Sequence, residues 1–336
     1  MNKIAVVGAG LAGLTLANQL KRTAEVTLFE KSRGVGGRLA TRWADPFYFD
    51  HGAQFFKAHS PAFKQLIEPL LAKGVVARWD ARFVEIAQGE IQQSRQWDKF
   101  YPHYVGVPSM NAFAGALAKG LAIQLNTQVA RLNKHQGMWQ LWDEQGRALG
   151  EFDWVVLAIP VAQAAALLQQ PTSFSNELTS IKMNACFALM LGFEQPLSLP
   201  FDAALVRGAD ISWISVNSSK PGRNASFTLL VNSTNSWAND HIDDDREAVM
   251  AHLCHETSKT IGQSVDGAVH KVVHGWRYAN VGKQTSPACL VDAQQQIGVC
   301  GDWLIQGRVN AAFDSGLALA EQWLAIHDSQ VTSMGW

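Results

Sequence analysis

Hydrophobic residues follow two kinds of spacing along the chain, and the first kind opens it. Residues 4–7, IAVV, form a continuous apolar run that ends at a glycine, as in a strand buried on both faces. Helix-like spacing follows through Leu14, Ala17 and Leu20, and residues 26–29 form a second strand-like run. These segments predict a βαβ unit with a parallel sheet.

The second kind of spacing, short alternating runs between turns, dominates the middle of the chain. The runs LAIQLNTQV, MWQLWDE and DWVVLAIP predict a meander that returns to the first unit, after a helix at residues 109–119. The runs ACFALMLGF, DISWISV, SFTLLV and AVHKVVHGWRYA predict an antiparallel sheet with a helix at residues 246–261. IGVCGD and helical spacing over residues 309–326 then resemble the opening strand-to-helix transition.

These patterns predict an α/β protein whose first domain is built from both chain ends. We expect a discontinuous Rossmann-like domain of residues 1–58, 103–160 and 289–330. Residues 59–102 and 161–288 are expected to form a second, mainly antiparallel-sheet domain that holds the substrate.

Composition narrows the classes of function. The 336 residues include 28 Lys and Arg against 29 Asp and Glu, so the net charge of −1 gives no field for binding nucleic acid. The four cysteines lack paired spacing, the chain opens directly on a strand, and no apolar run reaches membrane-spanning length. We therefore expect a cytoplasmic protein with reduced thiols and no membrane partner, and its oligomeric state stays open.

The first strand leads into a glycine motif with the spacing of a dinucleotide-binding turn. Gly8, Gly10 and Gly13 form G-x-G-x-x-G, and Glu30 ends the second strand. The glycines permit a tight turn and close approach of a pyrophosphate to a helix N-terminus, while Glu30 can accept hydrogen bonds from ribose hydroxyls. The alternative is a tight turn that binds nothing.

A second glycine-rich loop, EKSRGVGGR, follows Glu30 directly. Gly36 and Gly37 allow backbone to lie close to a ligand, and Arg38 offers a planar donor fork to phosphate oxygens. The loop favours a ligand that continues beyond the adenosine, as FAD does, although a solvated basic loop is the simpler alternative.

Other chemical constellations are weak. His252, Cys254 and His255 do not present a metal site, because only the two histidines share a helical face. The chain has no G-x-S-x-G and no C-x-x-C. His51 and His274 either approach the ligand or are core histidines.

Five segments in order resemble landmarks of the flavin-containing amine oxidase superfamily: GAGLAGL, EKSRGVGGR, DHGAQFF, VVLAIP and CGDWLIQGRVNAAFDSG. DHGAQFF, HGWRYANV and the CGDW segment most closely resemble the renalase subfamily, especially its bacterial members. The resemblance implies FAD, with helix amides near Val309 facing the flavin. The cofactor residues that motif and resemblance together nominate are Gly8, Gly10, Leu11, Ala12, Gly13, Glu30, Lys31, Gly36, Gly37, Arg38, Gln54, Val129, Gly301, Asp302, Val309 and Asn310.

Two departures from the superfamily matter. Some members join flavin to a cysteine, but Cys300 lies in an apolar strand and is expected in the core, so FAD is expected to bind noncovalently. Lys182 and Lys283 are possible counterparts of a lysine near flavin N5, and neither is assigned that role.

The resemblance also implies a reaction. Renalase-like enzymes are expected to take hydride from 2- or 6-dihydro isomers of NAD(P)H, to give NAD(P)+, and to pass electrons to O2, forming H2O2. Phe55, Tyr104 and Trp276 are expected to position the nicotinamide and Arg277 its carboxamide or a phosphate, with no acid or base assigned. A flavin amine oxidase, another carbon-hydride flavin oxidoreductase and a noncatalytic flavin-binding protein remain alternatives.

Overall fold

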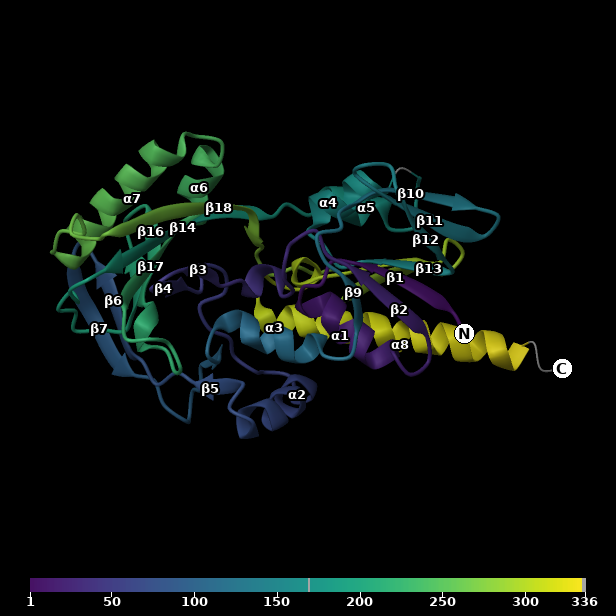
Figure 1. Ribbon diagram of the computed structural model, residues 1–336, viewed down its shortest axis with the longest axis horizontal. Helices are drawn as coiled ribbons and strands as arrows, with labels where there is room; N and C mark the ends of the chain where they lie inside the picture. Colours follow the sequence, from purple (N-terminus) through teal and green to yellow (C-terminus); the bar gives the residue numbers. More distant parts are fainter. Residues whose placement is uncertain (169, 334–336) are drawn as a thin grey trace.

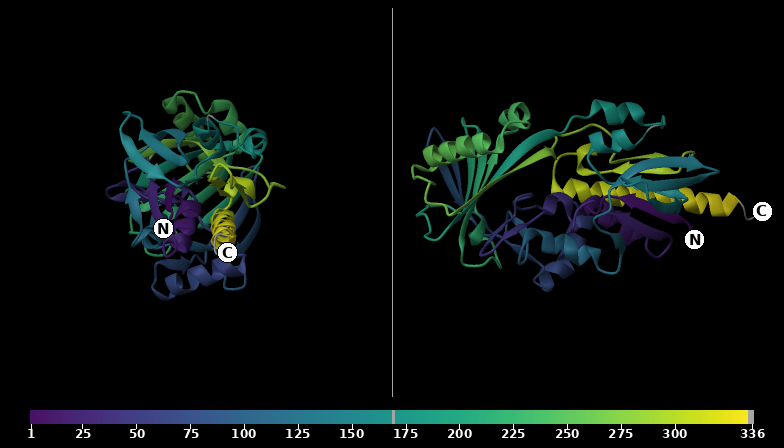
Figure 2. Two further views of the ribbon diagram at one scale, coloured as in Figure 1. Left: turned by 90° about the vertical axis from the view of Figure 1, so that its right-hand side faces the viewer. Right: turned by 45° about the horizontal axis from the view of Figure 1, so that its top comes forward.

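The computed structural model describes residues 1–168 and 170–333, with two main sheets toward opposite ends of an elongated molecule (Figure 1). No helix within the described ranges is long and apolar enough to cross a membrane. The expected cytoplasmic location stays a prediction. Both ends of the chain lie with the same sheet, as the sequence predicts (Figures 1 and 2).

The sheet near the termini has six strands in the order β19-β20-β13-β1-β2-β9. All neighbouring pairs are parallel except β19 and β20, so a Rossmann-like arrangement is confirmed. Its strands are β1 (Lys3–Val7), β2 (Glu25–Phe29), β9 (Ala122–Gln124), β13 (Trp154–Leu157), β19 (Cys289–Asp292) and β20 (Ile297–Cys300).

Alternate residues of β1 enter two different cores, which explains why its apolar run is continuous. Ile4 and Val6 pack with apolar residues of α1 (Leu11–Leu20), α3 (Met110–Ala118) and α8 (Val309–Ser333). Ala5 and Val7 pack beneath an additional three-stranded sheet. That sheet and its helices are β10 (Val129–His135), β11 (Met138–Asp143), β12 (Ala148–Phe152), α4 (Val161–Leu167) and α5 (Ser175–Ser180).

The opposite end carries a seven-stranded sheet in the order β18-β14-β17-β16-β15-β6-β7. Only β15 and β6 pair in parallel, so the predicted mainly antiparallel sheet is confirmed. Its outer face is covered by α6 (Asn235–His241) and α7 (Arg246–Ile261), the latter with its predicted bounds. The strands are β6 (Arg82–Ala87), β7 (Glu90–Gln96), β14 (Asn184–Phe193), β15 (Ala203–Arg207), β16 (Ile211–Val216), β17 (Phe227–Ser233) and β18 (His270–Asn280).

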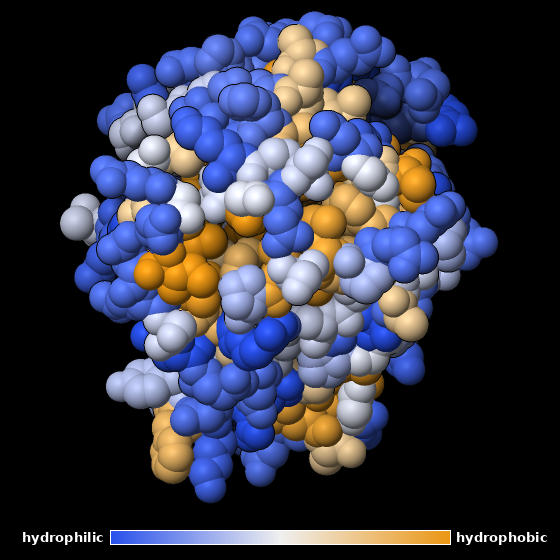
Figure 3. Space-filling model, turned by 90° about the vertical axis from the view of Figure 1, so that its left-hand side faces the viewer, coloured by the Kyte–Doolittle hydropathy of each residue, from blue (hydrophilic) through white to orange (hydrophobic). Residues whose placement is uncertain are grey.

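Short elements connect the two ends. The hairpin of β3 (Arg42–Ala44) and β4 (Phe47–Phe49) packs Phe47 and Phe49 on the inner face of the seven-stranded sheet. The remaining elements are α2 (Pro61–Ala72), β5 (Val76–Arg78), β8 (Tyr104–Gly106), and the 3-10 turns η1 (Gly37–Leu39), η2 (Asn217–Ser219) and η3 (Asp302–Leu304). Figure 3 views the molecule from the end that carries the seven-stranded sheet. Polar side chains cover most of this surface, and apolar side chains form separate patches on it.

The expected meander is confirmed for β10, β11 and β12, which pair as consecutive antiparallel strands before β13 returns to the six-stranded sheet, but its first run behaves differently. The run LAIQLNTQV contributes β9 to the six-stranded sheet, and β10 begins a separate sheet after a turn at Asn126. Asn126 has a φ of 51°, a left-handed conformation that breaks the extended run. The exact domain boundaries stay a prediction, although α4 and α5, expected in the substrate domain, pack with the six-stranded sheet.

The contact between α1 and α8 gives a first prediction. A Cβ at Gly316 would lie 2.3 Å from the carbonyl oxygen of Ala12, whereas one at Gly115 in α3 would meet nothing within 4 Å. Gly316→Ala should therefore lower the free energy of unfolding by about 1–3 kcal/mol, because the helices must separate. Gly115→Ala should leave it unchanged or raise it by up to about 1 kcal/mol. Chemical denaturation of both variants measures this, and equal values would contradict close packing at Gly316.

Candidate functional site

A cavity of about 1860 Å³ extends from the β1–α1 turn to the inner face of the seven-stranded sheet. Its walls include the loop after β2, the segment between β4 and α2, strand β18 and the start of α8. Segments from both ends of the chain and from both sheets therefore surround one space. Its size exceeds the 300–1,000 Å³ typical of small-ligand pockets, which suits a dinucleotide together with a second molecule.

The glycine motif shapes the cavity at the N-terminus of α1. Gly8 has a φ of 103°, and a Cβ there would lie 2.6 Å from the carbonyl oxygen of Ala158. A Cβ at Gly13 would lie 2.2 Å from the carbonyl oxygen of Gly8, so this glycine serves helix–strand packing. A Cβ at Gly10 would meet nothing and would enter the cavity space. Since no side chain caps α1, its first amides are available to an anion.

Glu30 holds the neighbouring turns in place. Its Oε2 accepts a hydrogen bond from the amide of Ala9 at 2.9 Å, and its Oε1 accepts one from the amide of Ser32 at 2.9 Å. The amide of Gly36 donates to the carbonyl oxygen of Ala9 at 2.8 Å, which ties the second glycine loop to the first. The two loops that the sequence singles out thus form one continuous wall.

An ion pair joins the second glycine loop to the C-terminal part of the chain. Arg38 donates to both carboxylate oxygens of Asp302 and, at 3.0 Å, to the carbonyl oxygen of Ala279. Asp302 begins η3 directly after β20. The Arg38 fork is therefore committed to a carboxylate, and it reaches a bound phosphate only with its remaining donors.

An aromatic cluster lines the opposite part of the cavity. The ring of His51 stacks on Trp276 with centroids 5.3 Å apart, and His274 lies edge-on to both. Burial, with contributions from His274 and Arg42, lowers the pKa of His51 to about 4. Burial also lowers the pKa of His274, so both imidazoles are neutral at pH 7. Phe55 and Trp213 line the same region, 5.5 Å apart.

The lining is strongly positive although the chain as a whole is not. Among the described lining residues, seven carry a cationic side chain and two carry a carboxylate. Arg38 and Arg277 are paired, the latter with Asp243. Both lining carboxylates are already engaged, Glu30 by backbone amides and Asp302 by Arg38. The other five cations are Lys31, Arg33, Arg42, Lys57 and Arg308.

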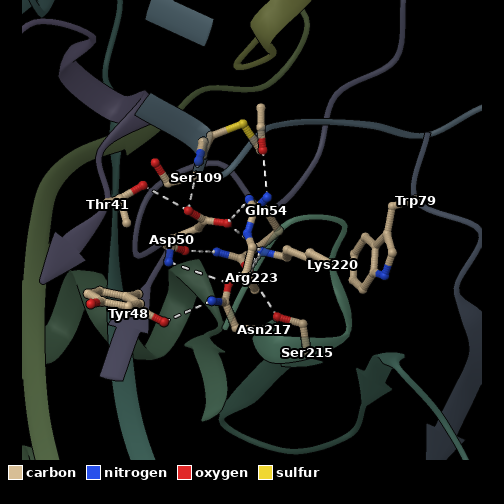
Figure 4. Close-up of polar contacts among 12 residues, drawn as sticks. Thr41, Tyr48, Asp50, Gln54, Trp79, Ser109, Ser215, Asn217, Lys220 and Arg223 are labelled. Atoms are coloured by element: carbon tan, nitrogen blue, oxygen red, sulfur yellow. Dashed lines mark hydrogen bonds and ion pairs between the residues drawn. The ribbon is translucent and has the colours of Figure 1, made fainter. Parts of the chain in front are cut away.

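A buried polar network that includes Asp50 and Gln54 stands behind the part of the cavity wall formed by residues 51–53, 55 and 56 (Figure 4). The carboxylate of Asp50 accepts hydrogen bonds from Arg223 at 2.5 Å and from Lys220 at 3.3 Å. It also accepts one from the amide of Met110, at the start of α3. Gln54 accepts hydrogen bonds from Lys220 at 3.1 Å and from Ser215 at 2.8 Å. The network fastens the loop after β16 to the cavity wall and to α3.

Two cations share one carboxylate in this network, and all three side chains are at most 2% exposed. Burial opposes ionisation of Asp50, but Lys220 and Arg223 outweigh it and lower its pKa to about 2. Burial, together with the positive charge of Arg223, lowers the pKa of Lys220 to about 8. The attraction of Asp50 opposes both effects but does not outweigh them. Burial thus makes Lys220 easier to deprotonate than an exposed lysine.

Most of the predicted site residues come together around the cavity. Three lie outside its lining: Gly13 packs against Gly8, Gln54 belongs to the buried network, and Tyr104 packs on Phe56 with centroids 5.8 Å apart. The side chain of Asn310 accepts from the amide of His59, so only its backbone remains for a cofactor. The lining includes Gly8, Gly10, Leu11, Ala12, Glu30, Lys31, Gly36, Gly37, Arg38, Phe55, Val129, Trp276, Arg277, Gly301, Asp302, Val309 and Asn310.

The lysine and cysteine candidates lie elsewhere. Lys182 and Lys283 are exposed and outside the lining. Cys300 is fully buried, and burial raises the pKa of its thiol. Within residues 1–168 and 170–333, no group of three metal-ligating side chains is present.

Sequence reasoning missed Lys220, Arg223 and the unpaired cations Lys57 and Arg308. Lys57 directly follows the DHGAQFF segment, and Arg308 directly precedes α8, so their positions beside recognised motifs are the available signal. Lys220 and Arg223 lie in a turn with no motif, about 170 residues from Asp50.

Comparison with known families now adds to this geometry. The family described as "Flavin containing amine oxidoreductase" matches residues 92–324, and the "NAD(P)-binding Rossmann-like domain" matches residues 6–70. The chain belongs to the flavin-containing amine oxidoreductase family. Membership makes it a flavin-dependent oxidoreductase, as the sequence predicts.

The chain is also similar to several individual proteins. Mouse renalase is 23% identical over 346 residues, covering 95% of this chain and 98% of renalase. A Staphylococcus aureus 4,4'-diapophytoene desaturase is 49% identical over 51 residues, 15% of this chain and 10% of its own. A putative protoporphyrinogen oxidase from Exiguobacterium has a TM-score of 0.78 at 14% identity, covering 96% and 98% of the two chains. Putrescine oxidase bound to putrescine gives 0.67 at 13% identity, covering 96% and 99%. The last two comparisons show the shared fold.

The buried network gives a second prediction. Asp50→Asn leaves two buried cations without a counter-ion, so it should lower the free energy of unfolding by about 3–5 kcal/mol at pH 7. Lys220→Met leaves the Asp50–Arg223 pair intact, and Ser215 still donates to Gln54. Its effect should stay below about 1 kcal/mol in either direction. Chemical denaturation measures both, and comparable losses would mean that Lys220 is needed to balance the cluster.

Proposed function

We propose that this protein is an FAD-dependent oxidase that takes hydride from 2- or 6-dihydro isomers of NAD(P)H and releases NAD(P)+. The similarity to renalase over 95% of the chain supports the proposal. The observation that carries it is the charge of the cavity: among the described lining residues, five cations lack an ion pair, against one carboxylate, Glu30, which two backbone amides already engage.

This charge disfavours an amine substrate. A primary amine is protonated at pH 7, since its pKa lies near 10, and binding a cation normally requires a carboxylate or an open aromatic cage. Here the aromatic wall of His51, His274 and Trp276 lies near Arg42, which helps to lower the pKa of both histidines. A phosphate-bearing nucleotide has the opposite charge and matches the excess of cations.

The proposed FAD site uses the features at the β1–α1 turn. The open space at Gly10 and the uncapped amides of α1 suit a pyrophosphate, and Glu30 has lone pairs left for ribose hydroxyls. We propose that the backbone of Val129 faces the adenine and that Asp302 and the first amides of α8 lie near the ribityl chain and flavin ring. FAD binds noncovalently, because Cys300 is buried away from the cavity.

The proposed reaction asks little acid–base work of the protein. When bound, FAD would supply the two-electron acceptor for the hydride, and its reduced form would return two electrons, with the proton gained as hydride and one from solvent, to O2 as H2O2. The donor needs no deprotonation, since loss of hydride from C2 or C6 makes its ring aromatic. Phe55, Trp213 and Trp276 orient the nicotinamide and exclude water, and neutral His51 and His274 add no further positive charge to this wall.

Gly10→Ala tests the cofactor site. Gly10 has a φ of −74° and a ψ of 179°, which alanine adopts without strain, and the new methyl group enters only cavity space. The variant should fold as stably as Gly115→Ala but bind FAD at least about tenfold more weakly, because the pyrophosphate can no longer approach. Acid precipitation of the wild type should release FAD into the supernatant. Unchanged affinity, or yellow colour in the pellet, would contradict the proposed site.

Anaerobic flavin bleaching tests the reaction. The 2- and 6-dihydro isomers of NAD(P)H should bleach the flavin of the holoenzyme within seconds, with NAD(P)+ as the product. Ordinary 4-dihydro NAD(P)H and a panel of primary amines should bleach it at least about a hundredfold more slowly, because neither matches both the geometry and the charge of the cavity. Fast bleaching by an amine would favour an amine oxidase, and no bleaching by any donor would favour a noncatalytic flavin protein.

A further inference from the structure

Three cations, Lys57, Arg95 and Arg308, gather beside the cavity without an opposing charge. Lys57 and Arg308 line the cavity, and Lys57 is half-buried. Arg95 on β7 lies over the ring of Phe83 at 4.7 Å. Burial, followed by Arg95 and Arg308, lowers the pKa of Lys57. The neighbours that act on Lys57 are thus cations and not carboxylates.

The backbone holds Lys57 and Arg308 near one another. The side-chain oxygen of Asn310 accepts hydrogen bonds from the amides of His59 at 2.7 Å and Ser60 at 3.3 Å. These bonds join the segment that carries Lys57 to the start of α8, which Arg308 precedes. The fold therefore places these two residues on neighbouring segments of the cavity wall.

No carboxylate compensates these cations. Within residues 1–168 and 170–333, none of the three forms an ion pair. The carboxylate of Asp314, on the same stretch of α8, accepts hydrogen bonds from Ser60 at 2.7 Å and Asn310 at 2.5 Å instead. Three neighbouring cations without a counter-ion favour the binding of an anion.

Lys57 lies two residues after Phe55, an aromatic residue that lines the cavity. Burial, followed by Lys57, lowers the pKa of His103 to about 4, and Arg95 contributes to the same shift. The His103 ring stacks on Trp97 at 3.5 Å and lies 4.9 Å from Phe55, which lines the cavity. The proposed FAD phosphates, in contrast, lie at Gly10 and Arg38. The cluster is therefore available to an anion other than the proposed FAD pyrophosphate.

We propose that Lys57, Arg95 and Arg308 form a subsite for a phosphate group of the substrate. Lys57 and Arg308 donate to the phosphate oxygens from the cavity wall, and Arg95 adds long-range attraction. The inference rests on the proposed function in taking a nucleotide as the substrate. It implies that the enzyme favours phosphorylated dihydronicotinamides over the bare riboside, and that this preference weakens as salt is added.

The test compares Lys57→Gln/Arg308→Gln with wild-type holoenzyme on 6-dihydronicotinamide riboside, mononucleotide and adenine dinucleotide. The wild type should show a kcat/KM at least about tenfold higher for the phosphorylated donors than for the riboside, as expected for two charge-assisted contacts. The double variant should lose this ratio through KM, while its riboside kcat/KM and FAD content stay unchanged. Arg207→Gln/Lys259→Gln, which removes the same charge outside the cavity, should keep the wild-type ratio.

Several outcomes would overturn the subsite. The first two are a wild type whose kcat/KM is equal for riboside and phosphorylated donors, and a double variant that keeps the wild-type ratio. The third is a double variant whose kcat/KM falls equally for riboside and nucleotides. The fourth is a double variant that loses FAD, which would assign the cluster to the cofactor. If no dihydronicotinamide bleaches the wild-type flavin, the proposed function fails. The anion subsite is then tested on its own, by calorimetric titration of the holoenzyme with inorganic pyrophosphate. Binding that the double variant loses supports the anion subsite, and absence of wild-type binding rejects it.

Discussion

The arrangement of the two sheets depends on one interaction, the ion pairing of the buried Asp50 carboxylate with Lys220 and Arg223. The carboxylate is reached by a lysine and an arginine from the turn between β16 and β17, and by the amide that opens α3. An ionised group in this position is stable only while its partners remain in place, because burial would otherwise favour its neutral form. The contact between Asp50 and the turn after β16 therefore allows one position of the seven-stranded sheet, because a shift of this sheet would separate buried charges as well as apolar surfaces.

The contacts of Asp50 also determine the shape of the cavity. The residues that follow Asp50 line the cavity, beginning with His51 of the aromatic wall. The side-chain amide of Gln54 donates to the backbone carbonyl oxygens of Asp50 and Gly52 and so fixes this segment. A side chain expected to contact cofactor thus acts one layer behind, by fixing the backbone that does line the space. The glycine loops at the other end are fixed in the same way, through backbone hydrogen bonds to Glu30 and Ala9.

Local patterns predicted the parts of the fold that local physics determines. The βαβ unit, the helix Arg246–Ile261 and the start of α8 at Val309 follow from apolar spacing and glycine punctuation. The glycine motif and Glu30 were found for the same reason. The Asp50–Lys220 contact joins residues 170 positions apart, and an unpaired cation such as Lys57 has the same sequence signature as a solvated one. Only the packed chain distinguishes them.

The strand order has a consequence for how the protein is made. In the six-stranded sheet, β1 lies between β2 and β13, while β20 and α8 follow the whole seven-stranded sheet along the chain. During synthesis the ribosome therefore exposes most of the chain, including the whole seven-stranded sheet, before Asp302 and the start of α8 can complete the cavity wall. A nascent chain that still lacks β20 and α8 thus has both glycine loops but not the wall that faces them, so the cavity is completed only after the seven-stranded sheet has been made.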